Sequence, residues 1–379
     1  MMKKSLLLSL TLAGVSALAV QPTVKYGQIK TSGPATAEEV AAAKAEFDAG
    51  KTKPDWARVE VVGGDDATIE ALVAAFPEAK LFSIDKTTKF TTLEPLTKLQ
   101  KVQTISLHYC NVEDLAPIGK IGTVTEVDLY GATVKDFSPL ASCPKLKTVN
   151  YYAVRVDQSV FDTLAALKQV KVFKGGLSSM TSLAWLKDHS NAEEVEVFSE
   201  NISDFSPIST LANLKRFRGW NMNERKLTGN GTSFIVPAVG DLAFLASCKK
   251  LERLELPGSS FSNTAALSGL SELKTIVLTS PIKDVDLGFV KTLPKLETLT
   301  VEGGRKDPVK VLNSEALAGH PALRDLALVN VQGATIAGLE TCPKLKNVRL
   351  SKDAFPVADT DKLQAALQAQ VKGAKVNLR

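Results

Sequence analysis

Segments of similar sequence recur through most of the chain, with a period close to 22 residues. One apolar residue, placed after Pro or its equivalent, marks each unit: Leu72, Leu96, Ile118, Leu140, Leu164, Leu186, Ile208, Leu245, Leu267, Val290, Leu317 and Leu339. Six of the eleven steps between markers are 22 residues, and the longest is 37. Twelve such units predict a solenoid, because one unit alone cannot bury its apolar face and must stack on its neighbours.

Each unit follows the pattern L-x-x-L-x-x-L-x-x-L-x-L, as at Leu245, Cys248, Leu251, Leu254 and Leu256. The last two apolar positions alternate with polar residues, which predicts a short strand with one buried face. The three-residue spacing before them favours a helical or 3-10 segment, entered through Asp-Phe-Ser-Pro with Ser as the cap. We therefore expect an α/β solenoid of about 12 repeats, a curved horseshoe with a parallel sheet on its concave face and short helices on its convex face.

The segment NISDFSPI, residues 201–208, resembles the leucine-rich repeats of bacterial internalins, as do its counterparts at 112–118 and 134–140. The resemblance covers residues 66–355, and it implies a horseshoe that binds partners through concave aromatic side chains. One feature departs from the family pattern. Internalin-type repeats usually have Asn or Cys just past the strand, where it forms a hydrogen-bonded ladder, but here most units have other residues, such as Ala132, Val154 and Ser259. Cys110 keeps the pattern.

The two ends of a repeat array expose core and need covers. Over residues 20–65 we expect a loose leader (20–35) and an N-terminal cap, with a helix over 36–50 that begins at Thr36 and a strand over 58–62. Residues 66–355 contain the repeats, with an insertion at 221–242. Residues 356–379 form the C-terminal cap, with a helix over 361–372 and a last strand over 375–378.

The first 19 residues have the pattern of a secretory signal peptide: two lysines, a short apolar run and Ala17-Leu18-Ala19 as a cleavage site. The alternative for this segment is a buried helix. No later stretch is long and apolar enough to span a membrane. We expect a bacterial protein that is exported to the periplasm or medium as a soluble monomer, without membrane insertion. The net charge of +5 comes without a block of like charge, so nucleic acid is not an expected partner.

The sequence has no HExxH, CxxC or GxSxG motif, so we expect no enzymatic activity, cofactor or metal. Three cysteines share one repeat position where other units have Leu, and the fourth lies at the ladder position: Cys143, Cys248, Cys342 and Cys110. This periodicity predicts free, buried thiols, since a bond between units so far apart would exceed the roughly 7 Å limit on Cα separation. His189 and His320 occupy the same repeat position and are expected in the core.

The residue after the second inward position of each strand should face the concave surface, because side chains alternate along a strand. In six consecutive units we read this position as His108, Tyr130, Tyr152, Phe173, Phe198 and Trp220. Charged outward positions lie beside it, among them Glu196, Arg216 and Arg218. Two interpretations remain open. The aromatic residues form a ligand-binding stripe with a polar rim, or they stack between adjacent strands and stabilise the sheet.

The insertion at 221–242 follows Trp220 directly and lengthens its unit to 37 residues. It is either a tolerated surface excursion or an addition to the binding face. We expect an exported, non-enzymatic recognition protein that binds a protein, peptide or glycan on the aromatic concave face. The alternative is a structural or assembly component of the cell envelope that uses the same face for packing or self-association.

Overall fold

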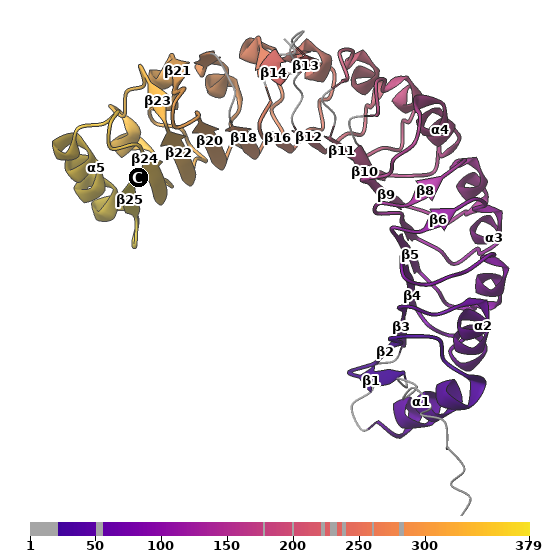
Figure 1. Ribbon diagram of the computed structural model, residues 1–379. Helices are drawn as coiled ribbons and strands as arrows, with labels where there is room; N and C mark the ends of the chain where they lie inside the picture. Colours follow the sequence, from indigo (N-terminus) through magenta and orange to yellow (C-terminus); the bar gives the residue numbers. More distant parts are fainter. Residues whose placement is uncertain are drawn as a thin grey trace, which may run out of the picture.

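The computed structural model describes residues 22–50, 56–176, 179–198, 201–220, 224–227, 233–236, 240–259, 261–279 and 284–379. They form an arc in which one long sheet lines the inner side and short helices follow the outer side (Figure 1). The predicted curved solenoid with a concave parallel sheet is confirmed. The proposed signal peptide, residues 1–19, lies outside the described residues.

The sheet has 16 strands. In spatial order they are β1 (Thr23–Lys25), β2 (Gln28–Lys30), β3 (Arg58–Val61), β4 (Leu81–Asp85), β5 (Thr104–His108), β7 (Glu126–Asp128), β9 (Thr148–Tyr152), β10 (Val172–Gly176), β11 (Glu194–Phe198), β12 (Arg216–Trp220), β16 (Arg253–Leu256), β18 (Thr275–Thr279), β20 (Thr298–Glu302), β22 (Asp325–Val329), β24 (Asn347–Leu350) and β25 (Lys375–Leu378). Within the described part of this sheet, only β1 and β2 pair antiparallel. The others are parallel, because the chain returns through the outer layer between strands.

The outer layer consists of short helices, one or two to a unit. They are α2 (Asp66–Ala75), η1 (Glu94–Lys98), α3 (Ala116–Gly119), η2 (Ser138–Ser142), α4 (Gln158–Asp162), η3 (Thr163–Ala166), η4 (Ala184–Leu186), η5 (Ser206–Thr210), η6 (Leu242–Leu245), η7 (Thr264–Leu267), η8 (Gly288–Thr292), η9 (Ser314–Leu317) and η10 (Leu339–Thr341), where η denotes a 3-10 helix. Small parallel sheets lie between the two layers: β6 (Asn111–Val112) with β8 (Thr133–Val134), β15 (Gly240–Asp241) with β17 (Phe261–Ser262), and β19 (Asp284–Asp286) with β21 (Val309–Leu312) and β23 (Val331–Gln332).

The apolar repeat positions form the continuous core between these layers. In the unit that begins at Leu245, its five pattern positions are each at most 1% exposed. Burial of each such side chain is worth roughly 1.5–3 kcal/mol, and it becomes complete only when the neighbouring units stack on both sides.

The two Asp-Phe-Ser-Pro segments, residues 136–139 and 204–207, lead into η2 and η5 through a turn in which Asp, and not Ser, accepts a backbone N–H. At η5 the Asp204 carboxylate accepts the Ser206 backbone N–H at 2.8 Å, and at η2 Asp136 accepts that of Ser138 at 2.7 Å. The prediction of Ser as the cap is wrong, because Asp two residues upstream reaches this N–H. Pro lies in the first turn of both helices, as predicted.

The N-terminal cap contains α1 (Ala37–Ala49) and β3, as predicted. Thr36 accepts the Glu39 N–H at 3.2 Å, and the Glu39 carboxylate accepts the Thr36 N–H at 2.8 Å, which is a complete capping box. The expectation of a loose leader is wrong for residues 23–30. They form the β1–β2 hairpin, whose second strand pairs with β3 and extends the sheet.

The C-terminal cap contains α5 (Val357–Gln370) and β25. The helix begins four residues before the predicted start, directly after Pro356, whose ring is compatible with the first positions of a helix. Leu363 and Leu367 face the core, and β25 pairs with β24 as the last strand of the sheet. The last repeat is thereby covered.

All four cysteines are free and buried, as predicted. Burial raises the pKa of the Cys110 thiol to about 12 and those of Cys143 and Cys248 to about 11. His189 and His320 are also buried, and each ring approaches a backbone carbonyl oxygen of the preceding unit. These residues belong to the core, which confirms the assignment from their shared repeat position.

Two residues occupy the ladder position with a polar atom turned inward. The Ser259 hydroxyl donates to the Gly219 carbonyl at 2.8 Å, and the Cys110 thiol donates to the Ile84 carbonyl at 3.5 Å. Each bond joins one unit to the preceding unit. In these two units the side chain therefore forms the hydrogen bond between units that Asn forms in a regular ladder.

Candidate binding surface

Strand alternation determines which side chains line the concave face. In β12, Phe217 and Gly219 are buried, whereas Arg216, Arg218 and Trp220 point to the other side of the sheet. The parallel register aligns these positions between strands, so that Phe198 is the partner of Trp220 and Glu196 the partner of Arg218. Outward residues of successive units therefore form columns that run along the inside of the arc.

One of these columns holds most of the predicted aromatic residues. We define the aromatic column as the following outward residues, taken from β5 to β12: His108, Tyr130, Tyr152, Phe198 and Trp220. Tyr130 is 39% exposed, and the other four are partly buried. Burial raises the pKa of Tyr152 to about 12, which agrees with a ring set against the sheet.

The assignment of Phe173 to this column is wrong. Phe173 is fully buried and pairs in register with buried Val149, so it is an inward residue of β10. The outward residue of this unit is Gly176, the register partner of Tyr152. The error arises because Gly175 occupies the second inward position of β10, and its lack of a side chain hides the apolar alternation.

Tyr109 is an exposed ring that the column did not include. It follows β5 in the left-handed conformation (φ 56°) and is 52% exposed. Its ring lies edge-on to Tyr130, with the centres 5.3 Å apart, and the Lys86 ammonium lies 5.4 Å from its centre. Gly131 makes room for the ring, since a Cβ there would lie 2.4 Å from it. The sequence signal is the neighbouring His108-Tyr109 pair at the end of the strand.

His108, the first member of the column, is connected to Tyr130 through the Asp128 carboxylate. Its Nε2 lies 3.0 Å from the Asp128 carboxylate, whose other oxygen accepts the Tyr130 backbone N–H at 3.1 Å. The hydrogen bond with Asp128 is the largest influence on His108, and it raises the pKa of the imidazole above the ordinary value. The negative charges of Asp85 and Glu60 raise the pKa of His108 further.

We expect this arrangement to produce an ordered titration of the three histidines. His108 should titrate above the ordinary pKa, whereas burial lowers the pKa of His189 and His320. The pair with Asp128 stabilises the fold fully below the unfolded-state pKa, near 6.5, and this contribution is lost as the pH rises through the folded pKa of His108. Imidazole proton NMR checks the order. Asp128→Asn should lower the pKa of His108 alone, and an unchanged value would show that the pair does not form.

A network of ion pairs lies beside the aromatic column on β10, β11, β12 and β16. Arg218 contacts Glu196 at 3.1 Å and Glu255 at 3.0 Å, and its guanidinium carbon lies 4.0 Å from the centre of the Trp220 ring. The Glu194 carboxylate lies 3.2 Å from both Lys174 and Arg216. Glu196, Arg216 and Arg218 lie on the outward side of β11 and β12, and their role in binding stays a prediction.

These side chains surround an open hollow of about 500 Å³ on the concave face. Arg253 and Glu255 also line it, although no feature of the repeat pattern marks them. The arginines are paired with carboxylates, so this part of the face presents polar hydrogen-bonding groups of both signs next to apolar rings. That combination is typical of protein interfaces with an aromatic centre and a polar rim.

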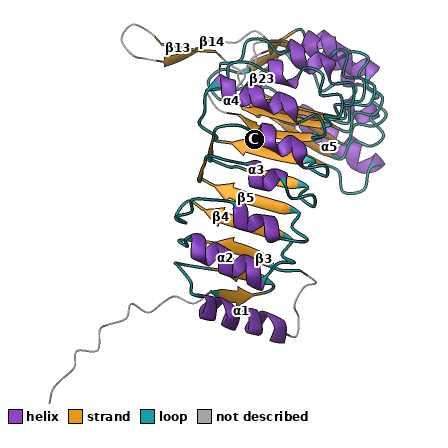
Figure 2. Ribbon diagram, turned by 90° about the vertical axis from the view of Figure 1, so that its right-hand side faces the viewer, coloured by secondary structure: helices purple, strands orange, loops and turns teal. Residues whose placement is uncertain are grey.

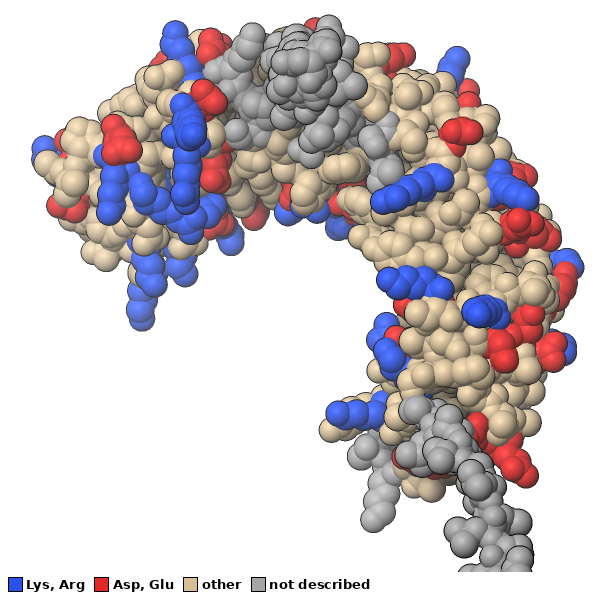
Figure 3. All heavy atoms as spheres, viewed as in Figure 1, with Lys and Arg blue, Asp and Glu red and all other residues tan. Residues whose placement is uncertain are grey.

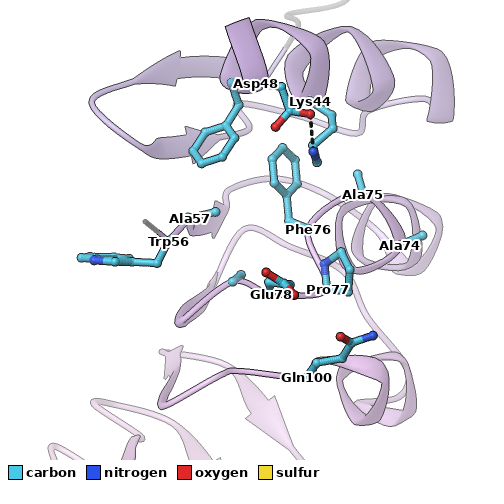
Figure 4. Close-up of a pocket in the computed structure, with 12 residues that line it drawn as sticks. Lys44, Asp48, Trp56, Ala57, Ala74, Ala75, Phe76, Pro77, Glu78 and Gln100 are labelled. Carbon is cyan, nitrogen blue, oxygen red and sulfur yellow. Dashed lines mark hydrogen bonds and ion pairs between the residues drawn. The ribbon is translucent and has the colours of Figure 1, made fainter. Parts of the chain in front are cut away.

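A second hollow, of about 590 Å³, lies between α1 and the segment that follows α2, away from the column (Figure 4). Phe47 and Phe76 lie edge-on at 5.6 Å, and Trp56 points away from them. The Lys44 side chain forms an ion pair with Asp48 across its upper edge. The hollow lies where the N-terminal cap meets the first repeats, and it shares no residue with the aromatic column.

Half of the predicted insertion at 221–242 lies outside the described residues. Its described backbone includes two antiparallel strands, β13 (Glu224–Leu227) and β14 (Ser233–Val236), which project from the stack as a hairpin (Figure 2). The hairpin begins four residues after Trp220 in the chain, at the end of the aromatic column. Whether it contributes to binding stays a prediction.

Comparison with known proteins identifies the fold. No protein-family model and no curated protein matches the sequence. An internalin from Listeria monocytogenes superposes with a TM-score of 0.58 at 16% identity, covering 85% of this chain and 86% of the internalin. This chain has the leucine-rich-repeat fold. A leucine-rich-repeat protein from Leptospira interrogans agrees, with a TM-score of 0.52 at 12% identity over 89% of this chain and 98% of that protein.

A third leucine-rich-repeat structure is TLR13 in complex with the single-stranded RNA ssRNA13. It superposes with a TM-score of 0.62 at 13% identity, covering 93% of this chain and 50% of TLR13. All three sequence identities are low, so the comparisons establish the architecture alone. Any ligand must be inferred from the side chains of this chain. In the described part of the chain no helix is long and apolar enough to cross a membrane, and no group of metal-binding side chains occurs.

Proposed function

We propose that this leucine-rich-repeat protein is an exported, non-enzymatic recognition protein that binds a protein, peptide or glycan ligand on its concave face. The observation that carries the proposal is the aromatic column, in which five of six consecutive units place an aromatic ring or imidazole on the outward side of the sheet. Export rests on the sequence of residues 1–19.

Ring geometry favours ligand binding over packing as the reason for the column. Phe198 and Trp220 are register partners, yet among the described residues their rings form no aromatic pair with each other. Gly176 lies between Tyr152 and Phe198 in the column, and it has no side chain that could pack against either ring. His108 and Tyr130 do lie edge-on with their ring centres 6.2 Å apart, but this contact does not continue through the other described rings of the column, so cross-strand packing explains only part of the arrangement.

Physical chemistry supports a ligand in contact with these rings. Aromatic side chains, together with Arg, are the groups that most often carry the binding energy of protein interfaces. The column ends next to Arg218, which is held by two carboxylates and lies against Trp220, so its position is fixed before any ligand arrives. Such preorganisation lowers the entropic cost of binding.

The test compares ligand capture by matched variants of the mature chain. Tyr152→Ala/Phe198→Ala removes two rings of the column, and Leu312→Ala/Val357→Ala removes two exposed apolar side chains elsewhere. Bait proteins are incubated with bacterial envelope and host extracts, with single-stranded RNA and with the chain itself. We expect the concave variant to lose at least about tenfold in captured ligand, because hot-spot residues contribute about 2 kcal/mol or more, while the control keeps wild-type capture.

Three results would argue against the proposal. Equal capture by both variants would show that the column is not the site. Retention of single-stranded RNA in place of protein or glycan would change the ligand class. Capture of the chain by itself, with mass rising with concentration in light scattering, would favour the assembly alternative.

A further inference from the structure

The net positive charge of this protein is concentrated in its C-terminal end. Residues 341–379 contain eight Lys and Arg against three Asp and Glu, an excess of five that equals the net charge of the whole chain. Lys and Arg side chains gather at this end of the arc on the face shown in Figure 3. Basic and acidic residues are therefore equal in number in the rest of the sequence, and an anionic ligand would be attracted to the C-terminal end.

A column of charged residues lies beside the N-terminal ends of the strands, and along most of it positive and negative residues alternate. We define the charge ladder as Lys171, Glu193, Lys215, Glu252, Lys274, Glu297 and Arg324, followed by Lys346. From Glu193 on, each backbone N–H donates to the carbonyl of the preceding member at 2.7–2.9 Å, so the residues are stacked one above another. The same backbone series holds Lys147 before Lys171 and Lys375 after Lys346, outside the part in which the sign of the charge alternates.

The sign of the charge alternates along the ladder up to Arg324. Glu193 pairs with Lys171 at 2.6 Å and with Lys215 at 2.8 Å, and Lys274 pairs with Glu252 at 2.7 Å. After Arg324 the next member is Lys346, so two positive residues are adjacent where the pattern would place a carboxylate. The alternation therefore ends in an excess of positive charge.

These last two members line an open hollow of about 520 Å³ together with Lys344 and Lys372. All four side chains are exposed, and in the described ranges none of them forms an ion pair. The hollow contains one carboxylate, Asp325, whose Oδ1 accepts the Asn347 side-chain N–H at 2.6 Å. Four cations thus converge on one hollow against a single anion.

We propose that this hollow, the C-terminal basic hollow, binds an acidic polysaccharide through its sulfate or phosphate esters. Four unpaired cations in a hollow attract a polyanion with several charges more strongly than a single ion, and they release its counterions on binding. A single-stranded nucleic acid fits less well, because binding of its bases relies on aromatic stacking platforms and the hollow's lining includes no aromatic residue. The site is separate from the aromatic column and stands whether or not the proposed function holds.

The experiment measures heparin binding by the full chain at several salt concentrations. Lys346→Glu restores the alternation of the charge ladder and should weaken heparin binding at least tenfold at low salt, with a smaller dependence of the dissociation constant on salt. Lys98→Glu makes the same change of net charge in η1, at the other end of the arc, and should leave binding within twofold of wild type. Neutral dextran should not bind, and dextran sulfate should compete.

Lys344→Gln/Lys372→Gln is the second variant, in case Lys346→Glu disturbs the fold. It should also weaken heparin binding, while the thermal unfolding midpoint stays that of the wild type. Equal losses in Lys346→Glu and Lys98→Glu would overturn the proposal, since binding would then depend on net charge alone. Tighter binding of poly(U) than of heparin, with the same variants affected, would replace the polysaccharide by single-stranded nucleic acid.

Discussion

Phe173→Ala should lower the free energy of unfolding by about 3–5 kcal/mol, as expected for truncation of a buried phenylalanine. Phe173 is fully buried, and its ring centre lies 5.2 Å from those of both Trp185 and His189. The substitution would remove both contacts and leave a cavity between units. Urea unfolding followed by far-UV circular dichroism measures the loss.

Phe198→Ala is the matched control in the neighbouring strand. Phe198 lies on the outward side and is only partly buried, so the same truncation should cost about 1 kcal/mol or less. Equal losses at the two positions would mean that Phe198 is also a packing residue, and the aromatic column would then be part of the scaffold.

Gly175→Ala should destabilise the protein by about 3 kcal/mol or more, because two costs add. Gly175 has a φ of 144°, a conformation that costs other residues about 1–3 kcal/mol. An added Cβ would also lie 2.6 Å from the backbone of Tyr151 and Tyr152, and overpacking of this kind costs about 1–3 kcal/mol. The buried Tyr151 ring occupies the space that a side chain at 175 would need.

Gly122→Ala provides the comparison for this second prediction. A Cβ at Gly122 meets no atom within 4 Å, so its effect should stay within about 0.5 kcal/mol. Thermal unfolding of both variants under the same conditions separates backbone strain from a general effect of replacing glycine. A Gly175→Ala protein as stable as Gly122→Ala would contradict the backbone conformation described for β10.

The architecture could be predicted from the sequence because each unit repeats the same burial pattern, and the N-terminal cap because Thr36 and Glu39 have capping-box spacing. The β1–β2 hairpin could not be predicted, because residues 23–30 show little apolar alternation and the pairing of β2 with β3 forms only in the complete sheet. The α5 helix begins before its predicted start because it follows Pro356 directly, and the periodic apolar positions of the helix begin only later, at Leu363.

The candidate site was predictable only where both inward positions of a strand carry a large apolar side chain. In β11, Val195 and Val197 mark the two inward positions, so Phe198 is correctly predicted to point outward. In β10, Gly175 occupies the second inward position without a side chain, and Phe173 was therefore wrongly predicted to be the outward residue. Tyr109 follows its strand in a left-handed conformation that a repeat pattern does not reveal. The pairing of Arg218 with Glu196 and Glu255 depends on which strands are neighbours, and the long insertion between β12 and β16 obscures that in the sequence.

The most direct test of the central claim is the dissociation constant of the captured ligand for three forms of the mature chain: wild type, Tyr152→Ala/Phe198→Ala and Leu312→Ala/Val357→Ala. Recognition through the aromatic column predicts that the concave variant binds at least about tenfold more weakly and stays folded, with an unfolding midpoint at most a few degrees lower, while the control binds like wild type. Wild-type affinity in the concave variant, or a loss that only accompanies unfolding, would contradict it.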